Sequence, residues 1–332
     1  MNRSWLAPLV PLYSAGIALR ELRLRRGWES ARRLRWPVVS VGNLSTGGVG
    51  KTPFVIALAR LLSAKGFDVD VLSRGYGRHS HLPARVRPGG TAEDFGDEPL
   101  LIALEAGVPV YVAPQRYNAG LMAEAHHSEE YARGLHLLDD GFQHRQLARD
   151  VDILLLNRAD WEDSLLPAGN LREPRHAIHR AAIVAIPATD QELENELKAW
   201  GWQGPVWRFH RQIEAPRIDG PVAAFCGIAR SEQFFAGLRA AGLSVATRVA
   251  FPDHHRYTLR DVQHLLFSAR GAGAKALITT QKDQTRLGRL AASIPRDLPL
   301  KYARLRIEIE EEASALEWLT TRLSQRKTGE PL

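Results

Sequence analysis

The chain has 332 residues, of which 45% are hydrophobic and 24% are charged. This composition excludes an intrinsically disordered protein, and the length is enough for about two domains of ordinary size. The only cysteine is Cys226, which excludes an internal disulfide and favours a reducing compartment; we expect it to be a small buried apolar residue.

The net charge of +7 is concentrated at the N-terminus. Residues 1–36 contain eight arginines against two glutamates, a net charge of +6, so the rest of the chain is close to neutral. A nucleic-acid-binding protein usually carries a basic surface on its folded domain. We therefore expect no nucleic-acid partner.

An apolar stretch over residues 5–19 precedes most of these arginines. It is shorter than the ~20 residues that span a bilayer. A signal peptide places its positive charge before the apolar run, whereas here the charge follows it. The apolar residues, Trp5, Trp28 and the arginines predict an arm over residues 1–36 that lies in an anionic membrane interface. The alternative is a helix packed on the protein's own surface.

The next segment, residues 37–205, is predicted to form a nucleotide-binding α/β domain. A short apolar strand at 38–41 leads into a glycine-rich loop and then a helix at 51–65, whose apolar residues recur at helical spacing. Strand-like runs alternate with helical stretches along this segment, which predicts a mostly parallel sheet covered on both faces. The further strands are predicted at 69–73, 108–113, 135–138, 151–156 and 182–186.

A polar stretch over residues 190–220 interrupts this alternation. A second α/β series follows it, with helices that begin near Ser231 and Leu259. We expect residues 206–332 to form a second, smaller α/β domain. Its strands are predicted at 222–226, 245–250, 276–280 and 301–309.

The segment from Gly42 to Thr52 reads GNLSTGGVGKT. A glycine-rich turn before a helix N-terminus supplies backbone N–H donors for phosphates, Lys51 supplies a cation, and the Thr52 hydroxyl supplies a ligand for Mg²⁺. The pattern predicts a P-loop that binds ATP with Mg²⁺, although Ser45 replaces the usual first glycine. The expected ATP-binding residues are Ser45, Thr46, Gly47, Gly48, Val49, Gly50, Lys51 and Thr52.

Two carboxylates, Asp139 and Asp140, end the strand predicted at 135–138. The carboxyl ends of strands in α/β sheets face the crevice where ligands bind. With Thr52, these residues are the expected Mg²⁺ ligands. The alternative for Asp139 is a helix N-cap or a solvated turn, and the sequence does not separate the two aspartates.

Several further motifs accompany the P-loop: SRGYG at 73–77, GDEP at 96–99, DDGFQH at 139–144, LPAGNLREP at 166–174, FPDH at 251–254 and TQKD at 280–283. Taken together with the P-loop, they resemble the tetraacyldisaccharide 4′-kinase family, the lipid A 4′-kinases of Gram-negative bacteria. They occur in the family's order, and the resemblance covers about residues 1–285. Departures are Arg230–Ser231, where the family often has a proline, and Gln281, where we expect a glutamate.

The resemblance implies transfer of the ATP γ-phosphoryl group to the 4′-hydroxyl of a tetraacyldisaccharide 1-phosphate, giving lipid IVA. It also implies a peripheral enzyme on the cytoplasmic face of the bacterial inner membrane, whose partners are the lipid disaccharide and the anionic membrane surface. We expect a monomer. The alternatives are a P-loop ATPase that couples hydrolysis to a protein partner or metal insertion, and a membrane adaptor without activity. Neither explains the motifs at 96–99 and 171–174.

The resemblance also implies that Asp97 and His254 act in catalysis together with Lys51. A histidine can take the proton of a sugar hydroxyl, and a carboxylate can fix its tautomer. For Asp97 the alternative is a helix N-cap, and His255 is a rival for His254.

The acceptor sugar and its 1-phosphate call for arginine forks and for hydrogen-bonding carboxamide or carboxylate groups. For each candidate taken alone, a surface ion pair is an equal alternative. Lys282 and Asp283 could either contact the nucleotide or cap a helix, and we assign neither role. The candidates for the acceptor site are Asn43, Arg74, Tyr76, Arg116, Gln143, His144, Arg172 and Glu173.

Overall fold

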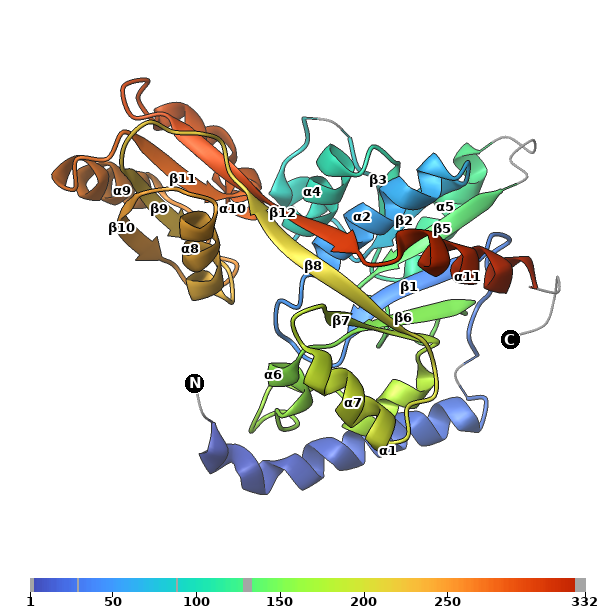
Figure 1. Ribbon diagram of the computed structural model, residues 1–332. Helices are drawn as coiled ribbons and strands as arrows, with labels where there is room; N and C mark the ends of the chain where they lie inside the picture. The colour runs from blue at the N-terminus through green and yellow to red at the C-terminus, as the bar shows by residue number, and fades with distance from the viewer. Residues whose placement is uncertain (1–2, 29, 88, 128–132, 326–332) are drawn as a thin grey trace.

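The computed structural model describes residues 3–28, 30–87, 89–127 and 133–325 of the chain. Residues 1–2 and 29 of the expected arm and residues 326–332 of the expected second domain lie outside this description. The described chain forms a larger and a smaller α/β part, which share one 12-stranded sheet and are joined by two long strands (Figure 1).

The larger part contains the parallel strands that position the glycine-rich loop. Their order is β7-β6-β1-β5-β2-β4, with the short β3 antiparallel at the edge. Val41 of β1 pairs with Asp139 of β5 on one side and with Ile153 of β6 on the other, so β1 is central. The strands are β1 (Val38–Asn43), β2 (Asp68–Ser73), β3 (Ala84–Arg85), β4 (Val110–Val112), β5 (Gly134–Asp139), β6 (Val151–Leu155) and β7 (Ile183–Pro187).

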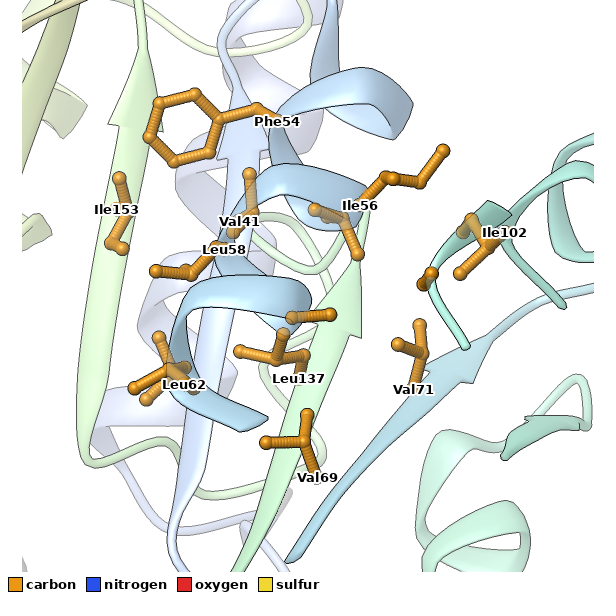
Figure 2. Close-up of a cluster of buried hydrophobic side chains, with 14 of the residues drawn as sticks. Val41, Phe54, Ile56, Leu58, Leu62, Val69, Val71, Ile102, Leu137 and Ile153 are labelled. Carbon is orange, nitrogen blue, oxygen red and sulfur yellow. The ribbon is translucent and has the colours of Figure 1, made fainter. Parts of the chain in front are cut away.

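Alternate side chains of these strands enter hydrophobic cores on opposite faces of the sheet. Val39 and Val41 pack with α2 (Lys51–Ala64), as Figure 2 shows for the α2 side chains above the strands, whereas Val38 packs on the other face with α5. The expected covering of both faces is therefore confirmed. The other helices here are α3 (Ala92–Phe95), α4 (Asp97–Glu105), α5 (Arg116–His126), α6 (Arg158–Trp161), α7 (Gln191–Ala199) and the 3₁₀ segment η2 (Arg175–Arg180).

Two long antiparallel strands, β8 (Val206–Glu214) and β12 (Leu300–Ile309), connect the two parts. The start of β8 continues the parallel sheet beside β7, and the start of β12 pairs with β11 of the smaller part. The strand predicted at 301–309 is confirmed. In contrast, β8 and α7 lie in the polar stretch at 190–220, for which no element is predicted.

The smaller part has the parallel strand order β10-β9-β11 and then β12. Cys226 is buried at the end of β9, as expected. Helix α10 lies against α4 of the larger part, so the two parts meet there. The elements are β9 (Val222–Cys226), β10 (Val245–Ala250), β11 (Ala276–Thr280), α8 (Ser231–Ala240), α9 (Leu259–Gly271), α10 (Gln281–Leu287) and the 3₁₀ segment η3 (Gly288–Ser293).

The C-terminal helix α11 (Glu312–Ser324) returns to the larger part. Its Leu316 and Leu319 enter the same core as α2. The expected boundary between residues 205 and 206 falls where β8 begins, but the last helix packs with the first unit. The division into 37–205 and 206–332 stays a prediction.

The N-terminal arm forms a 3₁₀ segment, η1 (Ser4–Leu9), and helix α1 (Val10–Arg25), which lies along the larger part (Figure 1). Tyr13 Oη donates to the Arg172 carbonyl at 3.0 Å, and Arg20 Nη2 donates to the Gln143 carbonyl at 2.6 Å. The arm also exposes apolar side chains, with Trp5 77% and Leu12 75% exposed. Among the described helices none is long and apolar enough to cross a membrane.

Candidate active site

The glycine-rich loop connects central strand β1 to helix α2, so its backbone N–H groups lie at a helix N-terminus. Gly50, the residue before the helix, has φ +92°, a left-handed conformation that glycine adopts without strain. Lys51 Nζ lies 2.8 Å from Asn43 Oδ1 and 3.5 Å from Asp140 Oδ1. Thr52 is buried in the first turn of α2. The geometry expected of a P-loop is present.

Ser45, which departs from the usual motif, organises the loop. Its hydroxyl accepts hydrogen bonds from Asn43 Nδ2 at 2.9 Å and from the Gly47 N–H at 3.2 Å. Thr46 lies beside the LPAGNLREP motif at 166–174, because its N–H donates to the Asn170 carbonyl at 2.9 Å. The serine side chain thus holds the turn that the missing glycine would otherwise make.

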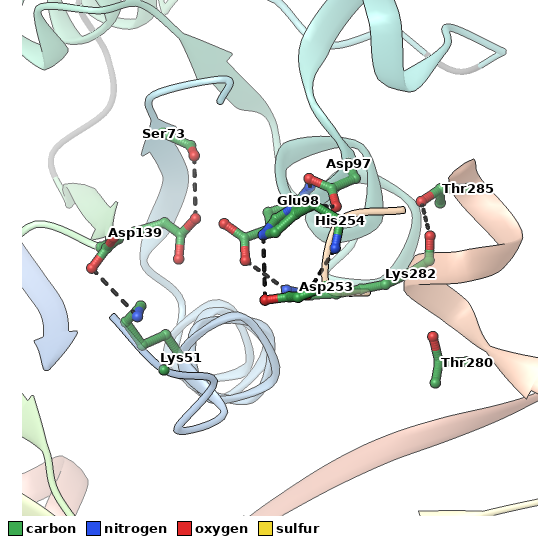
Figure 3. A network of polar contacts seen from close by, with 12 residues as sticks. Lys51, Ser73, Asp97, Glu98, Asp139, Asp253, His254, Thr280, Lys282 and Thr285 are labelled. Carbon is green, nitrogen blue, oxygen red and sulfur yellow. Dashed lines mark hydrogen bonds and ion pairs between the residues drawn. The ribbon is translucent and has the colours of Figure 1, made fainter. Parts of the chain in front are cut away.

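The two carboxylates at the end of β5 have different surroundings. Asp139 is buried; its Oδ2 accepts from Ser73 Oγ at 3.2 Å, and its Oδ1 has no hydrogen-bond partner among the described residues (Figure 3). The pKa of Asp139 is raised to about 7, mainly by burial and to a smaller extent by the nearby Glu98 and Asp140 carboxylates. Burial would also raise the pKa of Asp140, but Lys51 and Arg172 lower it well below its usual range.

A buried carboxylate oxygen without a partner, close to other carboxylates, is a position that a cation would stabilise. Within the described ranges, no group of three or more His, Cys, Asp or Glu side chains is arranged to hold a metal ion. P-loop enzymes bind Mg²⁺ with few protein ligands, because phosphate and water oxygens complete the shell. Asp139 and Thr52 fit that arrangement, whereas Asp140 is engaged by Arg172 at 2.8 Å.

A cavity of 1460 Å³ extends from the P-loop to the smaller part. Acceptor candidates that line it are Arg74, Tyr76, Arg116, Gln143, His144 and Arg172. Asn43 and Glu173 do not line it. Asn43 is fully buried beneath Lys51 and Arg172, and Glu173 forms an ion pair with Arg180 at 2.5 Å.

The part of the cavity next to α5 is strongly positive. Arg116 is buried, and its guanidinium donates only to the Pro114 carbonyl, at 2.9 Å, among the hydrogen bonds seen in the described chain. Burial and neighbouring Arg74 lower the pKa of Arg116 to about 10. The pKa of His144 is lowered to about 3, mainly by burial and to a smaller extent by Arg116, so this histidine is neutral near pH 7. An anionic group would relieve this repulsion.

Asp97 begins helix α4 in the larger part, and His254 lies in the loop after β10 in the smaller part (Figure 3). Asp97 Oδ2 is 3.4 Å from His254 Nδ1 and accepts from Arg286 Nε at 2.8 Å. The hydrogen bond to Asp97 raises the pKa of His254 despite partial burial. Burial would raise the pKa of Asp97, but His254 and Arg286 lower it well below its usual range.

His255, the rival histidine, points to a different environment. Its Nε2 lies 3.1 Å from Asp261 Oδ2, in the capping box of α9, and its ring stacks on Phe251 with centroids 4.5 Å apart. His254 instead contacts Tyr76, with ring centroids 5.8 Å apart, and lines the cavity, unlike His255. The geometry favours His254 as the residue that meets a substrate.

The TQKD motif joins the two parts of the protein. Lys282 Nζ donates to Glu98 Oε1 at 2.6 Å (Figure 3), and Gln281 contacts Glu105 on the same helix, α4. Asp283 is fully buried and accepts from the Gly227 N–H at 3.0 Å and from Thr280 Oγ1 at 2.6 Å. The N-cap of α10 is Thr280, whose hydroxyl accepts from the Asp283 N–H at 3.1 Å. Neither Lys282 nor Asp283 is the N-cap of α10: Lys282 pairs with Glu98 of α4, and Asp283 holds the loop after β9.

Four arginines near these groups are not predicted from the sequence. Arg211 of β8 donates to the Val49 carbonyl of the P-loop, and Arg230 pairs with Asp160 at 3.3 Å above the same loop. Arg20 of the arm and Arg286 of α10 complete the set. For Arg286 the available signal is its position three residues after the TQKD motif, on the same face as Asp283.

Comparisons with known proteins agree with the resemblance. The family model described as tetraacyldisaccharide-1-P 4′-kinase matches residues 2–324. A tetraacyldisaccharide 4′-kinase from Koribacter versatilis is 42% identical over 96% of this chain and 99% of its own, and one from Chromobacterium violaceum is 36% identical over 98% and 96%. The crystal structure of "apo" form LpxK from Aquifex aeolicus in complex with ATP is similar with a TM-score of 0.74 and 32% identity, over 97% of this chain and 100% of that one.

Proposed function

The chain belongs to the tetraacyldisaccharide-1-P 4′-kinase family, and from this premise we propose that Asp97 and His254 activate the acceptor hydroxyl at a P-loop served by Lys51. The protein is an ATP-dependent lipid-sugar kinase of lipid A biosynthesis; it transfers the ATP γ-phosphoryl group to the 4′-hydroxyl of a tetraacyldisaccharide 1-phosphate. A coupling ATPase has no support among these relatives. The observation that carries the assignment of roles is that Lys51, His254 and most acceptor candidates line one cavity.

His254 is the base in this proposal. A sugar hydroxyl is a poor nucleophile near pH 7, so a positioned base helps to remove its proton. Because Nδ1 faces Asp97, Nε2 is the ring nitrogen available for that proton. The acceptor oxygen bonds to the γ-phosphorus, the bond from that phosphorus to the β–γ bridging oxygen breaks, and ADP leaves.

Lys51 and the loop N–H groups bind the phosphates in this proposal, and the loop residues from Ser45 to Thr52 form the ATP site. Thr52 and Asp139 would hold Mg²⁺, which offsets charge on the β- and γ-phosphates when bound. The orphaned Oδ1 of Asp139 supports this assignment. Asp140 pairs with Arg172 and Lys51, so its role here is to orient those two cations rather than to bind metal.

The acceptor site in this proposal comprises the candidates that line the cavity. Arg74 and Arg116 suit the anionic 1-phosphate, while Tyr76, Gln143, His144 and Arg172 suit sugar hydroxyls and ring oxygens. Neutral His144 can both donate and accept hydrogen bonds. Asn43 and Glu173 support this site from behind, through Lys51, Arg172 and Arg180.

The arm would bind the membrane from which a lipid acceptor must come. Exposed Trp5 and Leu12 can enter the lipid interface, and the following arginines can contact anionic headgroups. We place the enzyme peripherally, on the cytoplasmic face of the inner membrane where ATP is available. We propose a monomer, because Lys51, His254 and most acceptor candidates of a single chain line one cavity.

Incubation with γ-labelled ATP and tetraacyldisaccharide 1-phosphate in detergent micelles tests this function. The expected product gains the mass of one phosphoryl group, and ATP consumption depends on the acceptor. Equal ATP hydrolysis without the acceptor, and no labelled lipid with it, would contradict the proposal.

A further inference from the structure

Arg286 of α10 connects the proposed catalytic pair to the rest of the smaller part. Its Nε donates to Asp97 Oδ2 at 2.8 Å and its Nη2 donates to the same oxygen at 2.5 Å. Its Nη1 donates to the Gly227 carbonyl and lies 3.3 Å from Asp283 Oδ1. One guanidinium therefore joins α4, the loop after β9 and α10.

This contact is shielded from solvent. The side chains of Arg286 and Asp97 are only 7% and 9% exposed, whereas His254 is 42% exposed. A buried carboxylate needs a cation and hydrogen-bond donors to stay ionised. Arg286 supplies both to Asp97, and neighbouring Lys282 is engaged by Glu98 instead.

Arg286 and His254 share one oxygen of Asp97. His254 Nδ1 lies 3.4 Å from Asp97 Oδ2, and Arg286 Nη2 lies 3.2 Å from that Nδ1. The carboxylate favours a proton on the imidazole, while the adjacent guanidinium charge disfavours it. The two opposing charges act on the same ring nitrogen.

We propose that Arg286 is a positioning residue for phosphoryl transfer, which fixes Asp97 against His254 and limits how strongly that carboxylate favours the charged imidazole. This inference rests on the proposed roles of Asp97 and His254. Arg286 lies one turn beyond the TQKD motif on α10. Positioning of Asp97 gives this arginine a role, which nucleotide binding does not.

The charged and titratable groups around His254 come from four segments. Asp97 faces it from α4, Arg286 from α10, and Tyr76 from the loop after β2; Asp253 of its own loop lies 3.9 Å from Nε2. Asp97 raises the pKa of His254, and the Arg286 charge lowers it. If His254 must be neutral to act, loss of the Arg286 charge moves the acid limb of kcat/KM to higher pH.

The experiment compares Arg286→Met, Arg286→Lys and Arg289→Met in the full-length enzyme. Arg289 is an exposed arginine just beyond the same helix and serves as the matched control. We measure kcat, both KM values and the pH dependence of kcat/KM, with melting curves to verify folding. Arg286→Met should lower kcat by about 10–100-fold, the loss typical when an outer-shell partner of a metal-binding side chain is removed, with an unchanged KM for ATP and an acid limb shifted to higher pH.

Arg286→Lys should restore the position of the acid limb and part of the rate, because it keeps the charge but loses the paired donors. Arg289→Met should resemble wild type. An unshifted limb in a folded Arg286→Met enzyme would overturn the inference, as would wild-type kcat. Failure of the proposed function looks different: wild type would lack acceptor-dependent transfer, or His254→Ala would remain fully active.

Discussion

His254 Nδ1 lies 3.4 Å from Asp97 Oδ2, although the two residues belong to different parts of the protein. The contact forms because α10 lies against α4 and brings the loop after β10 with it. His254 itself has φ +58°, a left-handed conformation uncommon for residues other than glycine, although histidine adopts it more readily than most. The proposed pair therefore exists only while the two parts are held together.

Lys51→Ala should reduce transfer by at least about 10²–10³-fold while leaving the fold intact, since it removes the cation that meets charge developing on the γ-phosphoryl group. Lys51 lines the cavity and contacts the polar side chains of Asn43 and Asp140 rather than a hydrophobic core. Labelled-lipid formation is the measurement, with Lys65→Ala, in the exposed turn after α2, as control. Normal turnover of folded Lys51→Ala would contradict the P-loop assignment.

A Trp5→Ser, Leu12→Ser double variant should lose much of its binding to anionic vesicles without losing ATP binding. Both wild-type side chains are largely exposed to solvent, and we expect them to be buried in lipid when the protein binds a vesicle. Deletion of residues 1–19 is less specific, because it also removes Tyr13 from Arg172. Cosedimentation with vesicles is the measurement. Phe267→Ser on α9, a residue 81% exposed, is the control and should bind normally; equal binding by all three proteins would place the anchor elsewhere.

Arg116→Gln should raise the KM for the lipid acceptor and leave the KM for ATP nearly unchanged. A hydrogen bond to a charged group contributes about 1.5–3 kcal/mol, so a rise of roughly 10–100-fold is expected. Steady-state kinetics with each substrate varied gives both constants. Arg87→Gln, at an exposed position away from the cavity, is the control. A rise in the KM for ATP alone would move Arg116 to the nucleotide side.

Asp97→Asn should shift the acid limb of kcat/KM to lower pH. In wild type the hydrogen bond to Asp97 raises the pKa of His254, so the neutral base is lost as pH falls through a value above its ordinary 6.5. Without the carboxylate charge, His254 stays neutral to a lower pH, although kcat also falls because the ring is less well oriented. A pH–rate profile from pH 5 to 9 tests this, and a limb moved to higher pH would contradict it.

The P-loop and its flanking elements could be predicted because each is encoded locally. Glycines mark the turn before Lys51, and the apolar residues of α2 recur at helical spacing within a single stretch of sequence. Strand β8 is different. Only Trp207 and Phe209 of this strand are buried, and it carries Arg208, His210 and Arg211, so its sequence reads as polar. Its identity as a strand depends on β7 and β12, which are distant in the chain.

The pairing of Asp97 with His254 could not be derived from spacing, because it depends on how the two parts meet; it came from the family resemblance. The same contact explains why Arg286 was missed. An arginine on a short helix carries no signal of the carboxylate it meets, and α4 and α10 face each other only in the folded protein. Asn43 illustrates the opposite case. The sequence predicts it as an acceptor residue, but the folded protein buries it behind Lys51.

The most direct test of the account is the double-mutant cycle of Asp97→Ala and His254→Ala, with kcat and the KM for ATP measured for each enzyme. Each single change should lower kcat by about 10²–10⁴-fold, the usual contribution of a general base, and barely alter the KM for ATP. The double variant should be scarcely worse than the worse single one, because coupled catalytic groups are not additive. His255→Ala, whose ring packs on Phe251, should stay near wild type. Multiplication of two independent losses, or a severe His255→Ala defect beside a mild His254→Ala one, would contradict the pair.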